Sequence, residues 1–280
     1  MLQVSTRPAL REALNAARAA GKRIGFVPTM GNLHGGHISL VKAAQESCDF
    51  VVCSIFVNPT QFGMNEDIDN YPRTLDADKA LLDESGVDLL FTPSVHDMYS
   101  DLELTWVEVN GITERHCGAS RPNHFRGVAT VVCKFLNLVQ PDCAYFGRKD
   151  YQQLAVIQRM VEDLFIPCEI IGVPTARAAD GLALSSRNGY LTPEERVLAP
   201  QLHACLQEAK ARIEAGVTDY NALTAWAKEQ LESGPWRLDY FTVCRQADLA
   251  PAEPEDRALV ILAASWLGRA RLIDNITLSR

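Results

Sequence analysis

The sequence predicts an α/β protein in which a Rossmann-like, doubly wound parallel sheet is followed by a smaller C-terminal α+β domain. Short apolar runs alternate with stretches of helical periodicity through the first part of the chain. Near residue 177 this alternation gives way to a loop rich in Gly and Ser, an Ala-rich helical region and further strands. We therefore expect two domains, residues 1–176 and residues 177–280.

Apolar runs mark the strands of the predicted parallel sheet. They occupy residues 24–27, 50–57, 87–91 and 143–146. Their apolar side chains are nearly continuous rather than alternating, which is typical of strands that are buried on both faces. Helices are predicted between and after them, over residues 37–45, 74–85, 128–139 and 151–164. This order of strand and helix indicates a doubly wound sheet.

The predicted second domain opens with a loop over residues 180–189 and a helix start signal. Thr192 can cap a helix, Pro193 suits its first position and Glu195 completes a capping box. Ala-rich helix is then expected to about residue 231. Strands are predicted over residues 238–244, 259–264 and 271–274.

Composition places the chain among globular proteins without a nucleic-acid or membrane partner. The formal charge is −8 and the pI is about 5.3, whereas binding to a phosphate backbone usually needs a concentrated basic surface. No window reaches the roughly 18 apolar residues of a membrane span, and the N-terminus lacks a signal pattern. We therefore expect a cytoplasmic protein. Its 8 cysteines are scattered without a C-x-x-C pair, so we interpret them as reduced packing residues.

The strongest chemical signal is the segment PTMGNLHGGH, residues 28–37, which follows the first predicted strand and runs into a helix. His34 and His37 lie three residues apart at the helix entrance and can contact one ligand. The glycines allow close backbone approach, and a helix N-terminus attracts phosphate. Taken alone, the motif fits a Gly-rich turn with two surface histidines equally well. Its position after the first strand favours a phosphate site.

The order of strand, H-x-G-H and helix resembles the nucleotidyltransferase superfamily, whose members bind ATP at that helix entrance. Further segments narrow the resemblance to the pantothenate synthetase family, in the family's order and over nearly the whole chain. These segments are FVNPTQF (56–62), YPRT (71–74), RPNHFRGV (121–128), FGRKDYQQL (146–154), residues 180–188 and RLIDN (271–275).

The resemblance implies a ligase that condenses (R)-pantoate with β-alanine. ATP is consumed, a pantoyl adenylate forms, and pantothenate, AMP and pyrophosphate are the products. It also implies a homodimer, with ATP, pantoate and β-alanine as the small-molecule partners. The second domain is then expected to act as a lid, because Ser185, Ser186 and Arg187 in its opening loop resemble the mobile second signature of the superfamily.

The resemblance also assigns site residues. For ATP these are Met30, Gly31, Asn32, Leu33, His34, Gly35, Gly36, His37, Gly147, Arg148, Lys149, Asp150, Ala176, Leu184, Ser185, Ser186 and Arg187. The catalytic candidates among them are His34, His37, Lys149, Ser185, Ser186 and Arg187.

Asn58, Gln61, Arg121 and Gln153 are assigned to the other substrates. Gln61 and Gln153 each follow a predicted strand, and a glutamine amide can both donate to and accept from a hydroxy acid. An arginine clamped on the carboxylate would make it a poorer nucleophile. Without the resemblance, a lone glutamine after a strand would be interpreted as a solvated loop residue.

Two departures from the family pattern stand out. Arg148 replaces the family's usual glutamate, and it could either strengthen phosphate attraction or point outwards. Asn123 replaces a glycine, and asparagine tolerates left-handed backbone.

Magnesium is expected to be held mainly by the phosphates of ATP and by water, with Asp78 as a weak protein candidate. The acidic segments 65–69 and 76–78 lack the ligand spacing of a calcium loop.

The sequence disfavours three other functions. A nucleotidyltransferase that leaves the nucleotidyl group on its product is disfavoured by Gln61 and Gln153. A synthetase acting on tRNA is disfavoured by the acidity and by the lack of an anticodon-binding domain. A non-catalytic nucleotide-binding module is disfavoured because every polar group that the mechanism needs is present.

Overall fold

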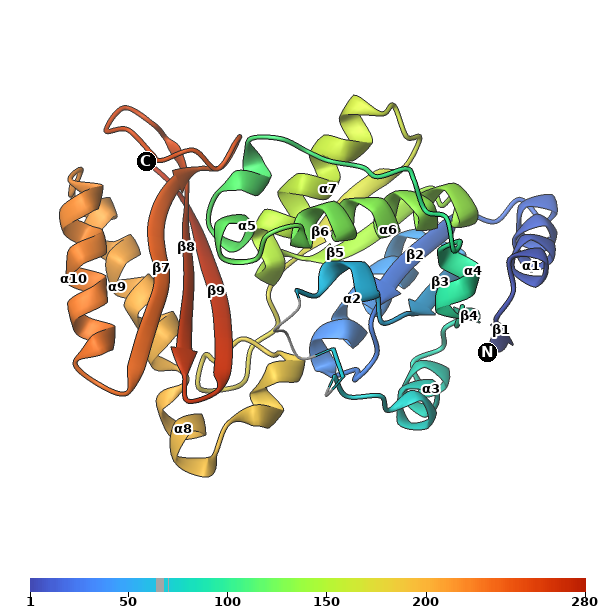
Figure 1. Ribbon diagram of the computed structural model, residues 1–280, viewed down its shortest axis with the longest axis horizontal. Coiled ribbons are helices and arrows are strands. Elements are labelled where there is room, and N and C mark those ends of the chain that lie inside the picture. Colours follow the sequence, from blue (N-terminus) through green and yellow to red (C-terminus); the bar gives the residue numbers. More distant parts are fainter. Residues whose placement is uncertain (64–67, 70) are drawn as a thin grey trace. The chain divides into compact units, whose positions relative to one another are not determined.

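The computed structural model describes residues 1–63, 68–69 and 71–280. The chain divides into two compact units (Figure 1). Unit 1 comprises Met1–Asn110, Arg121–Arg148 and Gln153–Pro174, and unit 2 comprises Gly111–Ser120, Lys149–Gln152 and Thr175–Arg280. Because two short segments before residue 175 belong to unit 2, no single sequence boundary separates the units.

Unit 1 contains the predicted parallel sheet. Within the described residues it has six strands in the order β1-β4-β3-β2-β5-β6, and all neighbouring pairs are parallel. The strands are β1 (Leu2–Val4), β2 (Ile24–Thr29), β3 (Phe50–Ile55), β4 (Leu89–Phe91), β5 (Cys143–Gly147) and β6 (Glu169–Val173). The α/β prediction is confirmed. The edge strands β1 and β6 were not predicted, because neither presents the continuous buried run of a central strand.

Helices connect these strands. They are α1 (Arg7–Ala19), α2 (Gly35–Ser47), α3 (Leu75–Glu84), α4 (Val95–Met98), α6 (His124–Val139) and α7 (Tyr151–Asp163), with the 3-10 turns η1 (Pro59–Gln61) and η3 (Arg148–Asp150). The prediction missed α1, although Thr6 caps it and a proline lies in its first turn. Asn123 precedes α6 with a φ of 66°, the left-handed backbone that asparagine was expected to tolerate.

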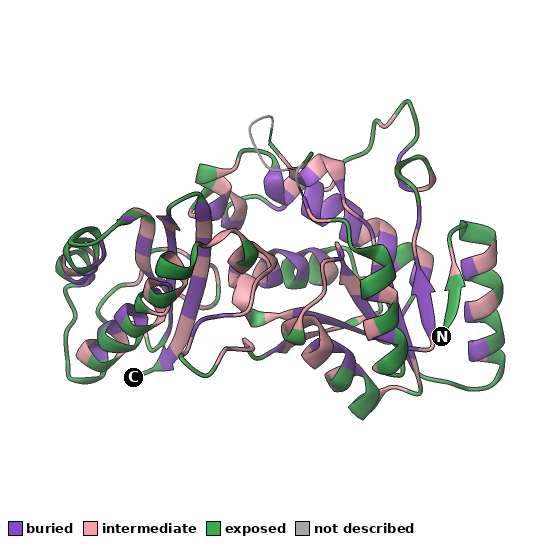
Figure 2. Cartoon of the chain, turned by 90° about the horizontal axis from the view of Figure 1, so that it is seen from below, coloured by how far each residue is buried: buried purple, intermediate pink, exposed green. Residues whose placement is uncertain are grey.

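Opposite faces of the sheet pack against different helices. On one face, apolar strand residues cluster with Leu40 and Val41 of α2 and Leu82 of α3. On the other, the rings of Phe26 and Phe91 contact Phe135 of α6, with centroids 5.6 and 6.3 Å apart. Figure 2 shows the central strands buried, while the helices carry buried and exposed residues on opposite sides. Burial on both faces explains the continuous apolar runs.

The strand order places a topological switch point beside β2. From β2 the chain adds β3 and then β4 on one side, and it later returns to place β5 on the other side. In open α/β sheets, ligands bind in the crevice outside the carboxyl ends of the strands at such a point. The residues that leave β2 and β5 here within unit 1 are 30–37 and 147–148, and all of them are ATP candidates.

One close approach fixes η1 against α6. A Cβ atom built on Gly127 would lie 2.3 Å from the carbonyl oxygen of Thr60, a distance that real Cβ atoms do not show. Only glycine therefore allows α6 to approach the turn that carries Gln61 this closely.

The described residues of unit 2 form a three-stranded antiparallel sheet, β7-β8-β9. Its strands are β7 (Trp236–Arg245), β8 (Ala258–Leu267) and β9 (Ala270–Ser279), and its helical segments are η2 (Ile112–Glu114), α5 (Cys117–Ser120), η4 (Ser186–Tyr190), α8 (Pro193–Leu198), α9 (Gln201–Glu214) and α10 (Tyr220–Glu232). Thr192 and Glu195 form the predicted capping box. The expectation of one Ala-rich helical stretch to residue 231 was too simple, because Pro200 and Gly216 lie at breaks between separate helices.

Helices α9 and α10 pack beside the β7–β9 sheet (Figure 1), and their apolar side chains form one core with it. No helix in the described ranges is long and apolar enough to span a membrane. All eight cysteines lie within these ranges as free thiols, and Cys53, Cys117, Cys143, Cys205 and Cys244 are buried.

Candidate active site

A buried carboxylate holds the turn that follows β2. Asp78, from α3, is only 3% exposed. Its Oδ2 accepts from the backbone N–H of Asn32 at 2.9 Å, and its Oδ1 accepts from that of Leu33 at 2.8 Å. The hydroxyl of Thr74 donates to Oδ2 at 3.1 Å. A charged acceptor with these donors fixes residues 30–33, which we call the nucleotide turn.

The nucleotide turn needs left-handed backbone at two successive positions. Gly31 has a φ of 80° and Asn32 a φ of 50°. A Cβ on Gly31 would also lie 3.0 Å from Oδ2 of Asp78. Glycine is therefore required on two grounds, conformation and space.

His34 and His37 form a reciprocal cap at the start of α2. Nδ1 of His34 accepts from the backbone N–H of Gly36 at 3.1 Å, and Nδ1 of His37 accepts from that of His34 at 3.3 Å. The ring centroids are 4.2 Å apart. Because each Nδ1 is an acceptor, each neutral ring carries its proton on Nε2. Two N–H donors therefore stand at the positive end of a helix dipole, which is an arrangement suited to phosphate.

The amide of Gln61 is oriented by its neighbours. Asn58, which is 1% exposed, donates through Nδ2 to Oε1 of Gln61 at 3.0 Å and to the carbonyl of Gly127 at 3.2 Å. The hydroxyl of Tyr99 donates to Oδ1 of Asn58 at 2.8 Å. Gln61 consequently turns its Nε2 the other way, where it lies 3.0 Å from Sδ of Met30 in the nucleotide turn. The glutamine amide thus adjoins the predicted ATP segment, and Asn58 orients it.

Arg121 contacts His124, which in turn binds the 3-10 turn η1 that carries Gln61. The sequence alone had not assigned His124 to the site. Nη1 of Arg121 lies 3.0 Å from Nε2 of His124, so this nitrogen accepts. The proton of the neutral ring is then on Nδ1, which donates to the backbone carbonyl of Gln61 at 2.8 Å. Arg121 and His124 therefore support Gln61 from its backbone side.

The two adjacent glutamines at the start of α7 differ in environment. Gln152 is buried, accepts from the N–H of Cys117 and donates to the carbonyls of Ile112 and Arg115. Gln153 is partly exposed. Gln152 has a structural role, which leaves Gln153 as the substrate candidate.

The turn after β5 carries the next group of ATP candidates. Arg148 donates through Nε to the carbonyl of Gly172 at 2.9 Å, so β6 holds this part of its guanidinium. Nζ of Lys149 lies 3.7 Å from Oδ2 of Asp150, and the Lys149 side chain is 17% exposed.

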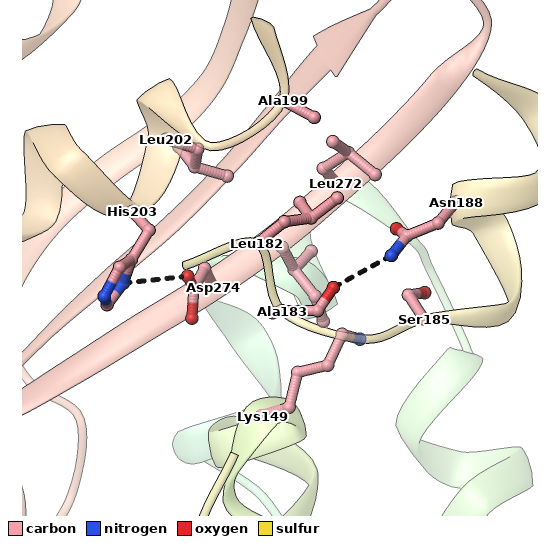
Figure 3. Close-up of a pocket in the computed structure, with 11 residues that line it drawn as sticks. Lys149, Leu182, Ala183, Ser185, Asn188, Ala199, Leu202, His203, Leu272 and Asp274 are labelled. Carbon is pink, nitrogen blue, oxygen red and sulfur yellow. Dashed lines mark hydrogen bonds and ion pairs between the residues drawn. The ribbon is translucent and has the colours of Figure 1, made fainter. Parts of the chain in front are cut away.

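Within unit 2, a small pocket brings Lys149 close to Ser185 (Figure 3). Residues 176–184 form a tight hairpin, in which Leu184 donates its N–H to the carbonyl of Ala176 at 2.9 Å. Ser185 caps η4 by accepting the N–H of Arg187 at 3.3 Å. Its hydroxyl hydrogen can therefore point to a ligand. Ser186 and Arg187 follow in the first turn of η4 and are half-buried.

Asp274 and Asn275 on β9 are the further residues that sequence reasoning did not place at the site. Asp274 accepts from both Nη atoms of Arg177, at 2.6 and 2.9 Å. Burial alone would raise the pKa of Asp274, but the His203 ring 3.4 Å away and the hydrogen bonds from Arg177 outweigh it and hold the pKa below its ordinary value. Asn275 donates to the backbone carbonyl of Lys149 at 2.8 Å. Both residues belong to the RLIDN segment, so the motif was visible although its contacts were not.

No group of three metal-ligating side chains occurs among the described residues. Both oxygens of Asp78 accept hydrogen bonds from the protein, so we assign this residue to holding the nucleotide turn. Residues 65–67 of the acidic segment lie outside the described residues.

Comparisons with known proteins cover nearly the full chain. The sequence profile of the pantoate-beta-alanine ligase family matches residues 3–277. A pantothenate synthetase of Pseudomonas aeruginosa strain UCBPP-PA14 is 57% identical over 279 residues, covering 99% of each chain. One from Alcanivorax borkumensis is 55% identical over 271 residues, covering 96% of this chain and 95% of that protein.

Solved structures agree. Pantothenate synthetase from Thermus thermophilus superposes with a TM-score of 0.92 at 47% identity, covering 99% of each chain. Pantoate-beta-alanine ligase from Francisella tularensis, solved in complex with beta-gamma ATP and beta-alanine, has a TM-score of 0.81 at 36% identity and covers 99% of this chain and 97% of that one. The chain therefore belongs to the pantoate–β-alanine ligase family, whose reaction is the ATP-dependent condensation of pantoate with β-alanine.

Proposed function

We propose that this chain condenses (R)-pantoate with β-alanine in two steps on one set of residues. The pantoate carboxylate attacks the α-phosphorus of ATP, and the bond to the bridging oxygen breaks to release pyrophosphate. The amine of β-alanine then attacks the carbonyl of the pantoyl adenylate, loses a proton and expels AMP. Most of the rate enhancement would come from positioning and charge stabilisation.

The observation that carries this proposal is the contact between Gln61 and Met30. It joins an oriented amide to the turn that leads into His34 and His37. The proposed site for a carboxylic acid would thus adjoin the proposed site for phosphate within unit 1. An adenylating enzyme needs this adjacency, because the carboxylate must reach the α-phosphorus while water is excluded.

Each side chain then has a proposed role. The Nε2–H groups of His34 and His37 would donate to phosphate oxygens as charge accumulates on them. The amides of Gln61 and Gln153 would hold the hydroxyls and carboxylate of pantoate while leaving the carboxylate nucleophilic. For unit 2 we propose contacts to the departing pyrophosphate, made by Lys149, Ser185, Ser186 and Arg187, with residues 180–188 acting as a lid.

Further proposals rest on the family resemblance. Mg²⁺ would be held by the phosphates of ATP and by water, where it would neutralise the charge of the leaving pyrophosphate. We also propose a homodimer in the cytoplasm with no nucleic-acid partner, in keeping with a net charge of −8.

The first prediction tests the adenylate. Labelled pyrophosphate should exchange into ATP when pantoate is present, without any β-alanine, because the first step is reversible on its own. The measurement is incorporation of label into ATP, with β-alanine alone as the blank. A strict requirement for the amine would contradict the two-step scheme, and formation of ADP would indicate an acyl phosphate.

The second prediction concerns His37. Its replacement in His37→Ala removes an Nε2–H donor that matters most as charge develops, so the exchange rate should fall by roughly a hundredfold to a thousandfold, about 3 to 4 kcal/mol. The KM for ATP should change much less, because other donors remain.

His96→Ala is the matched control, since the His96 side chain is 81% exposed. It should exchange at the wild-type rate. If His37→Ala instead lowered only the melting temperature and kept its rate per folded molecule, His37 would be a helix cap without a catalytic role.

The third prediction separates two roles for Asp78. In Asp78→Asn, an amide N–H₂ replaces one acceptor among three donors, so the nucleotide turn should loosen. The KM for ATP should rise by about tenfold, which corresponds to one charge-assisted hydrogen bond of about 1.5 kcal/mol. The concentration of Mg²⁺ needed for half-maximal rate, at saturating ATP, should stay at the wild-type value.

The control is Asp76→Asn, an exposed carboxylate in the first turn of the same helix, and it should leave both quantities unchanged. A large increase in the Mg²⁺ requirement of Asp78→Asn, reversed by excess Mg²⁺, would assign Asp78 to the metal.

A further inference from the structure

Strand β9 carries two buried polar residues side by side, Asp274 at 5% exposure and Asn275 at 7%. β9 is paired with β8 along its full length, from Ala270 opposite Leu267 to Ser279 opposite Ala258. Consecutive side chains of a strand point to opposite faces of the sheet. One well-supported strand therefore presents a polar group on each of its faces.

On one face, Asp274 holds the hairpin of residues 176–184. Its carboxylate accepts from both Nη atoms of Arg177, and Nη1 of Arg177 also donates to the carbonyl of Gly181 at 3.1 Å. Figure 3 shows Asp274 beside His203, whose Nδ1 lies 3.4 Å from its Oδ2. The hairpin leads directly into Ser185, so its position sets where η4 begins.

On the other face, Asn275 holds the chain at Lys149. Its Nδ2 donates to the backbone carbonyl of Lys149 at 2.8 Å, and its own N–H donates to Oδ1 of Asp274 at 2.8 Å. The two polar residues are thus linked to each other as well as to their separate targets. Both targets line the pocket in Figure 3, through Lys149 on one side and Ala183 and Ser185 on the other.

We propose that Asp274 and Asn275 are positioning residues that fix the spacing between Lys149 and the Ser185–Arg187 segment. This inference rests on the proposed function, in which both segments bind the departing pyrophosphate. A point charge and a pair of hydroxyls stabilise one leaving group only when they stand at a set distance from each other. We infer that β9 sets that distance. It is a strand paired along its full length, whereas neither segment is itself a strand of the sheet.

The test combines each substitution on β9 with substitutions that remove the proposed pyrophosphate contacts of one of the two segments, and compares the rates of the separate and combined variants. Asn275→Asp keeps the size of the side chain and removes the N–H₂ group that donates to the carbonyl of Lys149. Asp274→Asn removes the charge that binds the guanidinium of Arg177. Each should slow pantoate-dependent pyrophosphate exchange by roughly tenfold to a hundredfold, with the KM for pantoate unchanged.

Residues that act as a unit give non-additive losses. Asn275→Asp should therefore cost nothing further in a Lys149→Ala background. It should keep its full cost in a background that combines Ser185→Ala, Ser186→Ala and Arg187→Ala. Asp274→Asn should show the reverse pattern. Thr277→Val, two residues along β9 on the same face as Asn275, is the control and should exchange at the wild-type rate with the wild-type melting temperature.

Losses that multiply in both backgrounds, or a lower melting temperature with a normal rate per folded molecule, would show that the two residues only stabilise unit 2 and would overturn the inference. If Asp274→Asn does not fold, the inference can still be tested by comparing the cost of Asn275→Asp in its two backgrounds. Absence of exchange in the wild type would instead overturn the proposed function.

Discussion

The carboxylate of Asp78 is the constraint on which the candidate site depends. Two backbone N–H groups of the turn after β2 converge on it, and a buried charge is tolerated only when such donors surround it. The turn can in this way hold left-handed backbone at Gly31 and Asn32. The turn is followed directly by α2, whose first turn is capped by His34 and His37. Asp78 on α3 therefore determines the positions of the two imidazole rings.

The orientation of the Gln61 amide in unit 1 depends on one glycine, Gly127. Without a Cβ on Gly127, α6 approaches η1 closely enough for Asn58 to bond the Gly127 carbonyl and the Gln61 amide together. His124, from the first turn of α6, holds the backbone of Gln61. Packing thereby fixes which end of the Gln61 amide faces Met30. An amide held in this way can orient a carboxylate without the charge that would weaken it as a nucleophile.

The sequence predicted the parts of this architecture that depend on residues close together in the chain. The run over residues 24–27 and the motif at residues 28–37 identify β2 and the start of α2, because apolar continuity and Gly–His spacing need no distant partner. The edge strand β1 has only three residues, and its pairing with β4 across the chain leaves no local signal. Long-range roles were equally hidden: Asn32 and Asp78 are 46 residues apart, and Arg177 and Asp274 are 97 apart. The motifs contain Asn58, His124, Asp274 and Asn275, but the contacts by which these residues hold other parts of the site appear only after folding.

Attack of the pantoate carboxylate on the α-phosphorus of ATP can be followed by isotope transfer. Pantoate labelled with ¹⁸O in its carboxylate should be converted with ATP and β-alanine, and the products analysed by mass spectrometry. The bridging oxygen of the adenylate leaves with the phosphorus, so we expect one ¹⁸O atom in AMP and none in pyrophosphate. Unlabelled AMP, with the lost ¹⁸O atom found in pyrophosphate, inorganic phosphate or water, would contradict this mechanism.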